Sequence, residues 1–318
     1  YAAGDGRMLW SNSWSVANRG KFTVMEDTGH AAPTPVTDGR MVWAIYAGGD
    51  LAGLRTDEGT KIWMEQLGPF KNAYGYASSL AYHGGKVIAL LDQGDADDRL
   101  SRIAAFDGES GRQLWNTPRP VPNSWASLLV VRDGPAASII TAANPFVIAY
   151  DAETGIEQWR VECLEGDIAP TPVYADGIVY AVNANACLAA IPFGPAPAVK
   201  WKTTENLPDI CSPLALGGKI YLLMTYGMLT CFDGADGKKQ WEHDLGLTFK
   251  TSPSAIGETL LLIGNDGTII CARGGDAFVE TGRSKIDDAF NASPAFVPGA
   301  IFLRGTQKLW CIRAPSGG

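Results

Sequence analysis

One short pattern recurs along the whole chain: an apolar run, a turn rich in Asp and Gly, and then a tryptophan. Its clearest copies are LTCFDGADGKKQW at 229–241, IAAFDGESGRQLW at 103–115 and VIAYDAETGIEQW at 147–159. Asp, Gly and Ser provide the left-handed backbone that a tight turn needs, so each copy is expected to form a β-hairpin. The fold must therefore be built from a repeated hairpin.

A second pattern marks the start of each unit: Ser or Thr, usually followed by Pro, then a Gly-containing turn and a β-branched run. Seven units result, with starts near residues 34, 78, 127, 171, 212, 252 and 293. Four short strands in a unit of about 40–50 residues are typical of a propeller blade. We predict an all-β fold: one domain, residues 1–318, forming a seven-bladed β-propeller of four-stranded antiparallel blades.

The two ends of the chain are expected to share a blade. Residues 1–13 contain only the last strand of a unit, whereas the unit that starts near 293 has only three strands. We predict that residues 6–13 close the last blade as its outer strand, which would remove an open sheet edge. Residues 15–30 are surplus to the repeat and are predicted to form an insertion on one rim.

Six tryptophans take one equivalent place in the repeat. A side chain that recurs with the repeat is expected to fill the core between stacked units. In the one remaining unit, which starts near 252, Thr281 takes this place, so its blade is predicted to dock least tightly. The structural tryptophans are Trp10, Trp63, Trp115, Trp159, Trp201 and Trp241.

Composition argues against several classes of function. The net charge is −8 at pH 7, whereas nucleic-acid-binding proteins carry a basic stripe for phosphate. No apolar run approaches the roughly 18 residues of a membrane span. A secretory signal or lipid anchor would precede residue 1. We therefore expect neither a nucleic-acid partner nor a membrane span in this region.

The six cysteines lack the spacing of metal ligands, and no metal site is predicted. Cys231, Cys271 and Cys311 share one slot that other units fill with Gly or Ala, so they are interpreted as buried free thiols. The remaining three, Cys163, Cys187 and Cys211, fall near one rim, and pairing among them stays open.

A short acidic insertion, DQGDADDR at 92–99, lies between the second and third predicted strands of the unit that starts near 78. Its four aspartates suggest either a hard-cation site or a solvated acidic loop. The spacing lacks the Gly and Glu of an EF-hand loop, which favours the solvated loop.

Candidate binding residues lie just before the inner strands, because these strands begin at the mouth of a propeller's central channel. Aromatic, carboxylate and amide side chains around such a funnel suit a polar ligand or an extended peptide. The alternative is that they only cap strand ends and hydrate the mouth. Asp167 and Asp209 would also allow acid/base chemistry if they approached within about 5–10 Å. The candidates are His30, Tyr74, Tyr76, Asn123, Trp125, Asp167, Asp209, Lys250 and Asn291.

The units resemble the pyrroloquinoline-quinone (PQQ)-type repeat, with its apolar strand, A-x-D-x-x-T/S-G turn and trailing Trp. The segment from Asp151 to Gly155, followed by Trp159, is the nearest copy. The resemblance implies a propeller fold, and its members include quinone-dependent alcohol dehydrogenases and cofactor-free propellers, such as the lipoprotein of the outer-membrane barrel-assembly machinery. The dehydrogenases carry an adjacent-cysteine disulfide over the quinone. This sequence has no Cys-Cys pair, so no catalytic residue is transferred and no cofactor is expected.

The favoured function is a non-catalytic binding or scaffolding propeller, which recognises a protein segment or a polysaccharide on its rim or funnel face. By resemblance it is expected in the periplasm or outside the cell. The alternative is an enzyme, either a PQQ-dependent dehydrogenase or a carbohydrate-active propeller.

Overall fold

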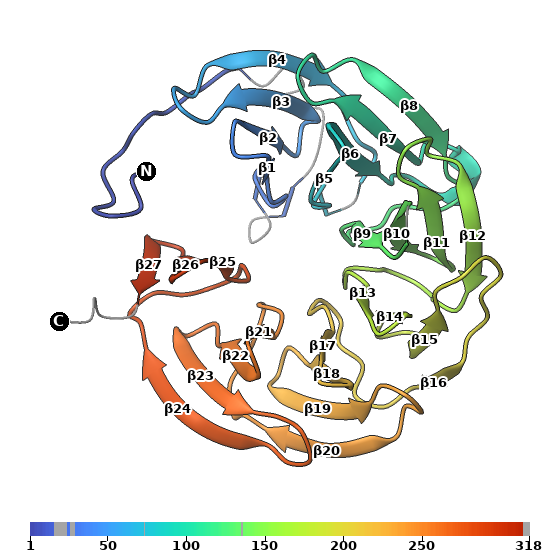
Figure 1. Ribbon diagram of the computed structural model, residues 1–318, viewed down its shortest axis with the longest axis vertical. Coiled ribbons are helices and arrows are strands. Elements are labelled where there is room, and N and C mark those ends of the chain that lie inside the picture. Colours follow the sequence, from blue (N-terminus) through green and yellow to red (C-terminus); the bar gives the residue numbers. More distant parts are fainter. Residues whose placement is uncertain (16–23, 26–28, 73, 135, 314–318) are drawn as a thin grey trace. The chain divides into compact units, whose positions relative to one another are not determined.

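The fold is a seven-bladed β-propeller, which confirms the predicted fold class (Figure 1). The structure is a computed structural model and describes residues 1–15, 24–25, 29–72, 74–134 and 136–313. These residues form 27 strands and one short 3-10 helix, η1 (Ala96–Asp98). Within every blade, strands that are consecutive in sequence are neighbours in the sheet and run antiparallel.

The chain forms two compact units, and unit 1 comprises residues 1–171 with 195–197. It contains the first three blades, each of four strands. Blade 1 is β1 (Val36–Thr37), β2 (Met41–Ile45), β3 (Asp50–Arg55) and β4 (Lys61–Gln66). Blade 2 is β5 (Ala81–His83), β6 (Lys86–Leu91), β7 (Arg102–Asp107) and β8 (Gln113–Pro118). Blade 3 is β9 (Leu129–Arg132), β10 (Ala137–Ala143), β11 (Phe146–Asp151) and β12 (Glu157–Glu162).

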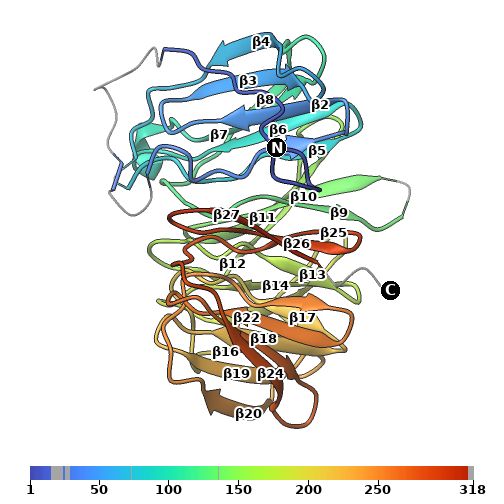
Figure 2. The ribbon, with the colours of Figure 1, turned by 90° about the vertical axis from the view of Figure 1, so that its left-hand side faces the viewer.

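Unit 2 comprises residues 172–194 and 198–318 and contains four blades. Blade 4 is β13 (Val173–Ala175), β14 (Ile178–Val182), β15 (Leu188–Pro192) and β16 (Trp201–Thr203). Blade 5 is β17 (Leu214–Leu216), β18 (Lys219–Leu223), β19 (Met228–Asp233) and β20 (Lys239–Asp244); Figure 2 shows these four strands in order across their sheet. Blade 6 is β21 (Ser254–Ile256), β22 (Thr259–Ile263), β23 (Thr268–Arg273) and β24 (Val279–Lys285). Blade 7 is β25 (Ala295–Val297), β26 (Ala300–Arg304) and β27 (Leu309–Arg313).

The positions of the blades follow the repeat closely. Each inner strand begins two or three residues after its predicted unit start, from Val36 after 34 to Ala295 after 293. Most of the predicted insertion at 15–30 lies outside the described residues. The single domain predicted for 1–318 stays a prediction.

The Ser/Thr residues that mark the unit starts link neighbouring blades. In each link, the backbone N–H of one start residue donates to the side-chain hydroxyl of the next start residue along the chain. The hydroxyl thereby satisfies a backbone donor that lies outside the strands. The links are Thr34 to Ser79, Ser79 to Ser127, Ser127 to Thr171, Ser212 to Ser252 and Ser252 to Ser293, all at 2.9–3.0 Å. We call this series the hydroxyl belt.

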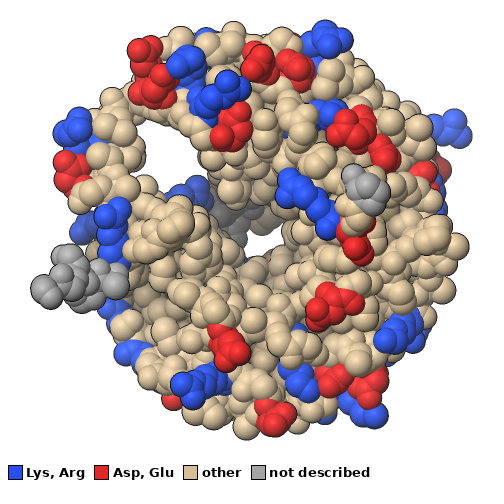
Figure 3. Space-filling model, viewed as in Figure 1, with Lys and Arg blue, Asp and Glu red and all other residues tan. Residues whose placement is uncertain are grey.

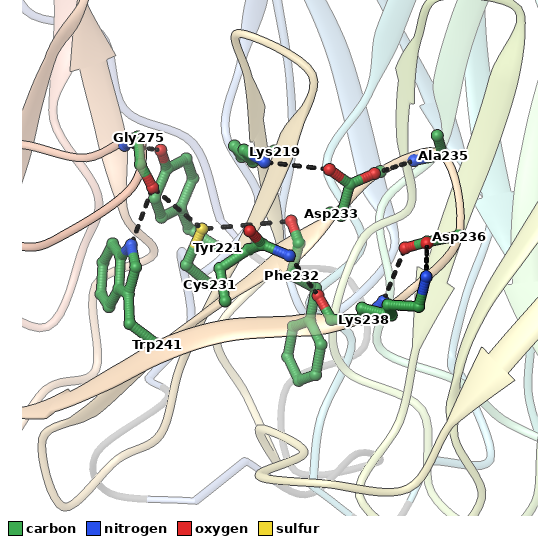
Figure 4. Close-up of polar contacts among 12 residues, drawn as sticks. Lys219, Tyr221, Cys231, Phe232, Asp233, Ala235, Asp236, Lys238, Trp241 and Gly275 are labelled. Atoms are coloured by element: carbon green, nitrogen blue, oxygen red, sulfur yellow. Dashed lines mark hydrogen bonds and ion pairs between the residues drawn. The ribbon is translucent and has the colours of Figure 1, made fainter.

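The repeat tryptophans form a second link, at the outer strands. Figure 4 shows the example between blades 5 and 6, where the Trp241 Nε1–H donates to the Gly275 carbonyl at 2.8 Å. The Gly275 N–H in turn donates to the Tyr221 hydroxyl at 2.9 Å. Indoles of other units make the same bond to the next turn: Trp10 to Thr56, Trp63 to Gly108 and Trp201 to Gly234.

The glycine of the repeated turn is required by this packing. Gly237 has a φ of +74°, which side chains rarely adopt, and a Cβ at this position would collide with the Trp201 ring. Apolar side chains of adjacent blades fill the space between these links. Trp43 and Leu51 of blade 1, for example, share one buried cluster with Val87 and Phe106 of blade 2. The core of each unit therefore lies between blades.

The place predicted for Thr281 is taken by Gly282. The strand register pairs Cys231 with Trp241 in blade 5, and Cys271 with Gly282 in blade 6. Gly282 lies 11 positions after Cys271, whereas Trp241 lies 10 positions after Cys231, so the hairpin of blade 6 holds one extra residue. All seven residues of β24 are exposed.

The fourth strand predicted at residues 6–13 is not formed. These residues belong to no strand, and blade 7 has three strands. Side chains rather than a backbone ladder hold this segment to blade 1: the Trp10 indole donates to Thr56, and the Asn12 amide donates to the Gly59 carbonyl at 2.8 Å. Closure of the last blade by this segment stays a prediction.

Charged side chains are interspersed on the face shown in Figure 3, with acidic and basic residues next to one another. Ion pairs of unit 1 include Lys71 with Asp98 at 2.6 Å and Lys86 with Glu153 at 2.7 Å. Within the described residues, no helix has the length and hydropathy to cross a bilayer.

Cys231 and Cys271 are free thiols, as interpreted from the repeat. The buried slot predicted for all three equivalent cysteines holds only for Cys231, because Cys271 is half-buried and Cys311 is exposed. Cys231 is buried, and burial raises the pKa of its thiol to about 11. Cys211 is also buried, and its Sγ donates to the Thr251 carbonyl at 3.4 Å.

We predict that truncating Trp63 destabilises the fold. Its ring is buried on Gly111 and its indole is bonded to Gly108, so Trp63→Ala should lower the free energy of unfolding by about 3–5 kcal/mol. Ile62→Ala is the control: this neighbour is 48% exposed and should change stability by about 0.5 kcal/mol or less. Urea unfolding measures both, and equal effects would contradict the structural role of Trp63.

Candidate functional site

Three loops at one end of unit 1 are tied together. They are residues 67–80, which precede β5, residues 92–101 between β6 and β7, and residues 119–128, which precede β9. Backbone hydrogen bonds join them: Gly94 N to Lys71 O at 2.6 Å and Asn123 N to Gly94 O at 2.7 Å. These backbone bonds thus bring together Lys71, Gly94 and Asn123, which are spread over about 50 positions of the sequence.

An aromatic pair lies on these loops. The Trp125 Nε1–H donates to the Asn72 Oδ1 at 2.9 Å and to the Gly75 carbonyl at 3.2 Å. The same Asn72 Oδ1 accepts the backbone N–H of Tyr74 at 3.2 Å. The two rings lie 4.9 Å apart at an angle of 50°, and Tyr74 is 43% exposed. We call Asn72, Tyr74 and Trp125 the aromatic platform.

A buried ion pair joins the bases of two of these loops. Arg119 and Asp92 are each about 1% exposed, and the guanidinium grips the carboxylate with Nε–Oδ1 at 2.7 Å and Nη2–Oδ2 at 3.0 Å. The remaining nitrogen, Nη1, donates to the Thr141 and Tyr150 hydroxyls at 2.7 and 2.8 Å. Burial alone would lower the pKa of Arg119, but the Asp92 and Tyr150 side chains raise it above its ordinary value. Arg119 is therefore a charged group inside the protein.

Two further side chains surround this pair. The buried Ser124, next to Trp125 in sequence, donates from its Oγ to Asp92 Oδ2 at 3.1 Å. Tyr76 is 2% exposed, stacks on Phe70 at 4.8 Å, and its hydroxyl has no hydrogen-bond partner. Burial, with a smaller contribution from the Asp92 charge, raises the pKa of Tyr76 above its ordinary value, so the phenol stays protonated.

The structure therefore places some of the residues predicted in this region on the surface and others in the core. Tyr74 and Trp125 touch one another, and the backbone of Asn123 holds the loop that carries Trp125. Tyr76 belongs to the core instead of the surface. The same is true of Asp92: it leaves the acidic loop to pair with Arg119, whereas Asp98 pairs with Lys71 and accepts the Asp95 N–H. The four aspartates predicted as one loop do not act as one group.

The other candidates lie elsewhere. In unit 1, His30 is exposed and its carbonyl accepts the Ala47 N–H, and Asp167 is exposed. In unit 2, Asp209 accepts the Thr225 hydroxyl, Asn291 accepts the Asn265 amide at 3.0 Å, and Lys250 is exposed. Asp167 and Asp209 belong to different units, so the acid/base chemistry considered for them stays a prediction.

A sequence model of the family described as outer membrane protein assembly factor BamB matches residues 1–119, 99–275 and 147–318. These matches cover the whole chain. The chain belongs to this family. Its PQQ-type repeats agree with the resemblance inferred from the Asp-Gly turns and trailing tryptophans.

Known proteins of the family are distant relatives. The chain is 23% identical over 292 residues to the outer membrane protein assembly factor BamB of Burkholderia pseudomallei, which covers 84% of this chain and 66% of that protein, just under two thirds of its length. The crystal structure of BamB from Moraxella catarrhalis superimposes with a TM-score of 0.69 at 20% identity, covering 88% of this chain and 82% of that one.

A similar fold is found in a quinohemoprotein alcohol dehydrogenase from Comamonas testosteroni, with a TM-score of 0.62 at 12% identity, covering 85% of this chain and 62% of that one. At this identity, the likeness is one of fold alone. Among the described residues of our chain, no group of three or more His, Cys, Asp and Glu side chains is arranged to hold a metal ion.

Reasoning from sequence missed Arg119, Asn72 and Ser124. Asn72 and Ser124 carry no signal, because a single amide or hydroxyl in a loop is common. Arg119 does carry one. It stands four residues after the repeat tryptophan, where the blade 1 and blade 5 copies have Leu67 and Leu245.

We predict that Arg119→Leu destabilises unit 1, because the buried Asp92 carboxylate loses its cation. The cost should be about 3–5 kcal/mol near neutral pH, measured by chemical denaturation. It should shrink as the pH falls: without Arg119, burial raises the pKa of Asp92, so the variant regains stability once this carboxyl is protonated in the folded state. The control is Arg160→Leu, whose pair with Glu157 is partly exposed and should contribute less than about 1 kcal/mol.

Proposed function

We propose that this chain is a non-catalytic binding propeller that works in the assembly of outer-membrane proteins, and that its aromatic platform receives an extended protein segment. The family membership supports the first part, since its members are described as assembly factors of outer membrane proteins. It also supports the periplasmic location expected from the sequence. The platform supports the second part.

The platform has the features of a binding hot spot. Tyr and Trp are enriched at such sites because they offer a large rigid apolar face with few rotatable bonds. Trp125 is held by two hydrogen bonds and needs no further ordering, which keeps the entropic cost of binding low. Tyr74 leaves nearly half of its surface open to a partner.

A protein segment fits this site better than a polysaccharide. Sugar-binding sites need polar groups that fix hydroxyls, whereas the Asn72 oxygen and the Trp125 N–H are already bonded to each other. Strands of outer-membrane barrels are segments of about 10 residues with alternating apolar and polar side chains. Before such a strand is paired, its alternate apolar side chains are free to pack on Tyr74.

The test uses a labelled peptide of about 10 residues with strict apolar–polar alternation, followed by fluorescence anisotropy against the full chain. Tyr74→Ala should weaken its binding about 5- to 30-fold, the loss expected for a hot-spot residue. A peptide of the same composition without the alternation is the probe control. Tyr1→Ala, which removes a tyrosine that is 70% exposed, is the protein control and should leave the affinity unchanged.

The proposal is wrong if Tyr74→Ala and Tyr1→Ala bind the alternating peptide equally well. Binding of a glucan or peptidoglycan fragment that is lost in Tyr74→Ala, without peptide binding, would instead assign the platform to a polysaccharide.

A further inference from the structure

We propose that the buried Arg119–Asp92 pair is a positioning device for the aromatic platform. The pair itself is out of reach of any partner, since both side chains are fully buried. Its role is to hold the loops that carry Trp125 and Asn72 in one arrangement. The inference rests on the proposed function only for the purpose of the platform, which is to bind a protein segment. The positioning of the platform is tested separately from binding.

The first observation is that blade 2 departs from its own repeat. In five blades, the residue four places after the tryptophan position donates its backbone N–H to the loop between the second and third strands. The donors and acceptors are Leu67 to Gly49, Arg119 to Ser101, Cys163 to Pro145, Leu245 to Gly227 and Ile286 to Gly267. Four of these five donors are apolar or a thiol, and only Arg119 is charged. The backbone link therefore does not require an arginine.

The second observation is that stability does not require the charges. Removing two charges from water costs more than a well-packed apolar pair of similar size, so replacing a buried ion pair as a whole is often neutral or stabilising. Blade 1 shows the apolar solution in this same fold, with Leu67 at the place of Arg119 and, by strand register, the buried Ala47 at the place of Asp92. A buried charge pair that stability alone does not call for points to another role.

The third observation is the path from the pair to the platform. Arg119 begins the loop that carries Trp125, and Asp92 begins the loop whose Gly94 accepts the Asn123 N–H. Asp92 also accepts the Ser124 hydroxyl, one residue before Trp125. Because both carboxylate oxygens are bonded, the pair fixes the angle between the two loops as well as their distance. The segment from Arg119 to Trp125 is thus bonded to Asp92 at Arg119 and at Ser124, next to Trp125.

The test measures the Trp125 indole directly. In 1H–15N spectra of the full chain, the indole signal of Trp125 is assigned by its loss in Trp125→Phe. The test variant is Arg119→Leu/Asp92→Ala, which copies the blade 1 pair. We expect its Trp125 indole N–H to exchange with solvent about tenfold faster, because the bonds to Asn72 and Gly75 open more often. The indole signals of Trp43 and Trp63, both bonded to Gly108, should not move.

A purely structural role predicts a different result. In that case the folded double variant keeps the exchange rate of the Trp125 indole, or all three indoles change together; either outcome overturns the proposal. If the double variant does not fold, Ser124→Ala decides in the same way, since it removes only the bond from Asp92 to the Trp125 loop. Its matched control is Ser138→Ala, a buried serine of blade 3 bonded to Gln158 at 2.7 Å.

Peptide affinity is measured on the same variants to separate the two proposals. Faster indole exchange together with about tenfold weaker peptide binding supports both. If the Trp125 indole exchanges faster in the double variant but Tyr74→Ala binds the peptide normally, the proposed function is refuted and the positioning role is supported.

Discussion

Two kinds of link outside the sheets join neighbouring blades within each compact unit. A propeller sheet satisfies its hydrogen bonds within itself, so the contact between blades is apolar and has no intrinsic register. The hydroxyl belt supplies one register point near the inner strand, through bonds such as Ser252 to Ser293. The indole bond to the next turn, as in Trp241 to Gly275, supplies another at the outer strand. Two points fix the rotation of a blade against the next, which one point cannot do.

These links explain why the repeat could be recognised in the sequence. Serine or threonine, glycine and tryptophan recur because they make the same bonds or contacts at several blade interfaces, so their spacing reports the architecture. Blade 2 is an exception, since the Trp115 Nε1–H has no hydrogen-bond partner. On this basis the number of blades could be predicted, and the starts of the inner strands could be predicted to within three residues. The strand register at Gly282 could not be predicted, because one extra residue in the hairpin changes which residue pairs with Cys271. The lack of a strand at 6–13 could not be predicted for another reason: the motif matches the repeat, but the bonds from Trp10 and Asn12 to blade 1 are made by side chains.

The candidate site was only partly predictable. The rule that residues before inner strands converge at one end located Tyr74 and Trp125, since it follows from the topology of a blade. It could not separate Tyr74 from Tyr76, because the chain between Phe70 and β5 has no regular period that would assign a face to each ring. Asp92 shows the same limit. Four aspartates within seven residues appear equivalent in sequence, and only the distant Arg119 selects one of them for the interior.

In a repeat protein, what all units share maintains the architecture, and what one unit does alone is available for function. Leu67, Leu245 and Ile286 show that an apolar side chain is sufficient to seat the end of an outer strand. Blade 2 replaces it with a charge that must be neutralised by Asp92, and the neutralising carboxylate then becomes an anchor for Ser124. An apolar contact constrains distance but is nearly indifferent to orientation, whereas a bidentate ion pair constrains both. A surface that must present two aromatic rings at a set angle gains from the second constraint, and this difference accounts for a buried charge pair beneath the aromatic platform.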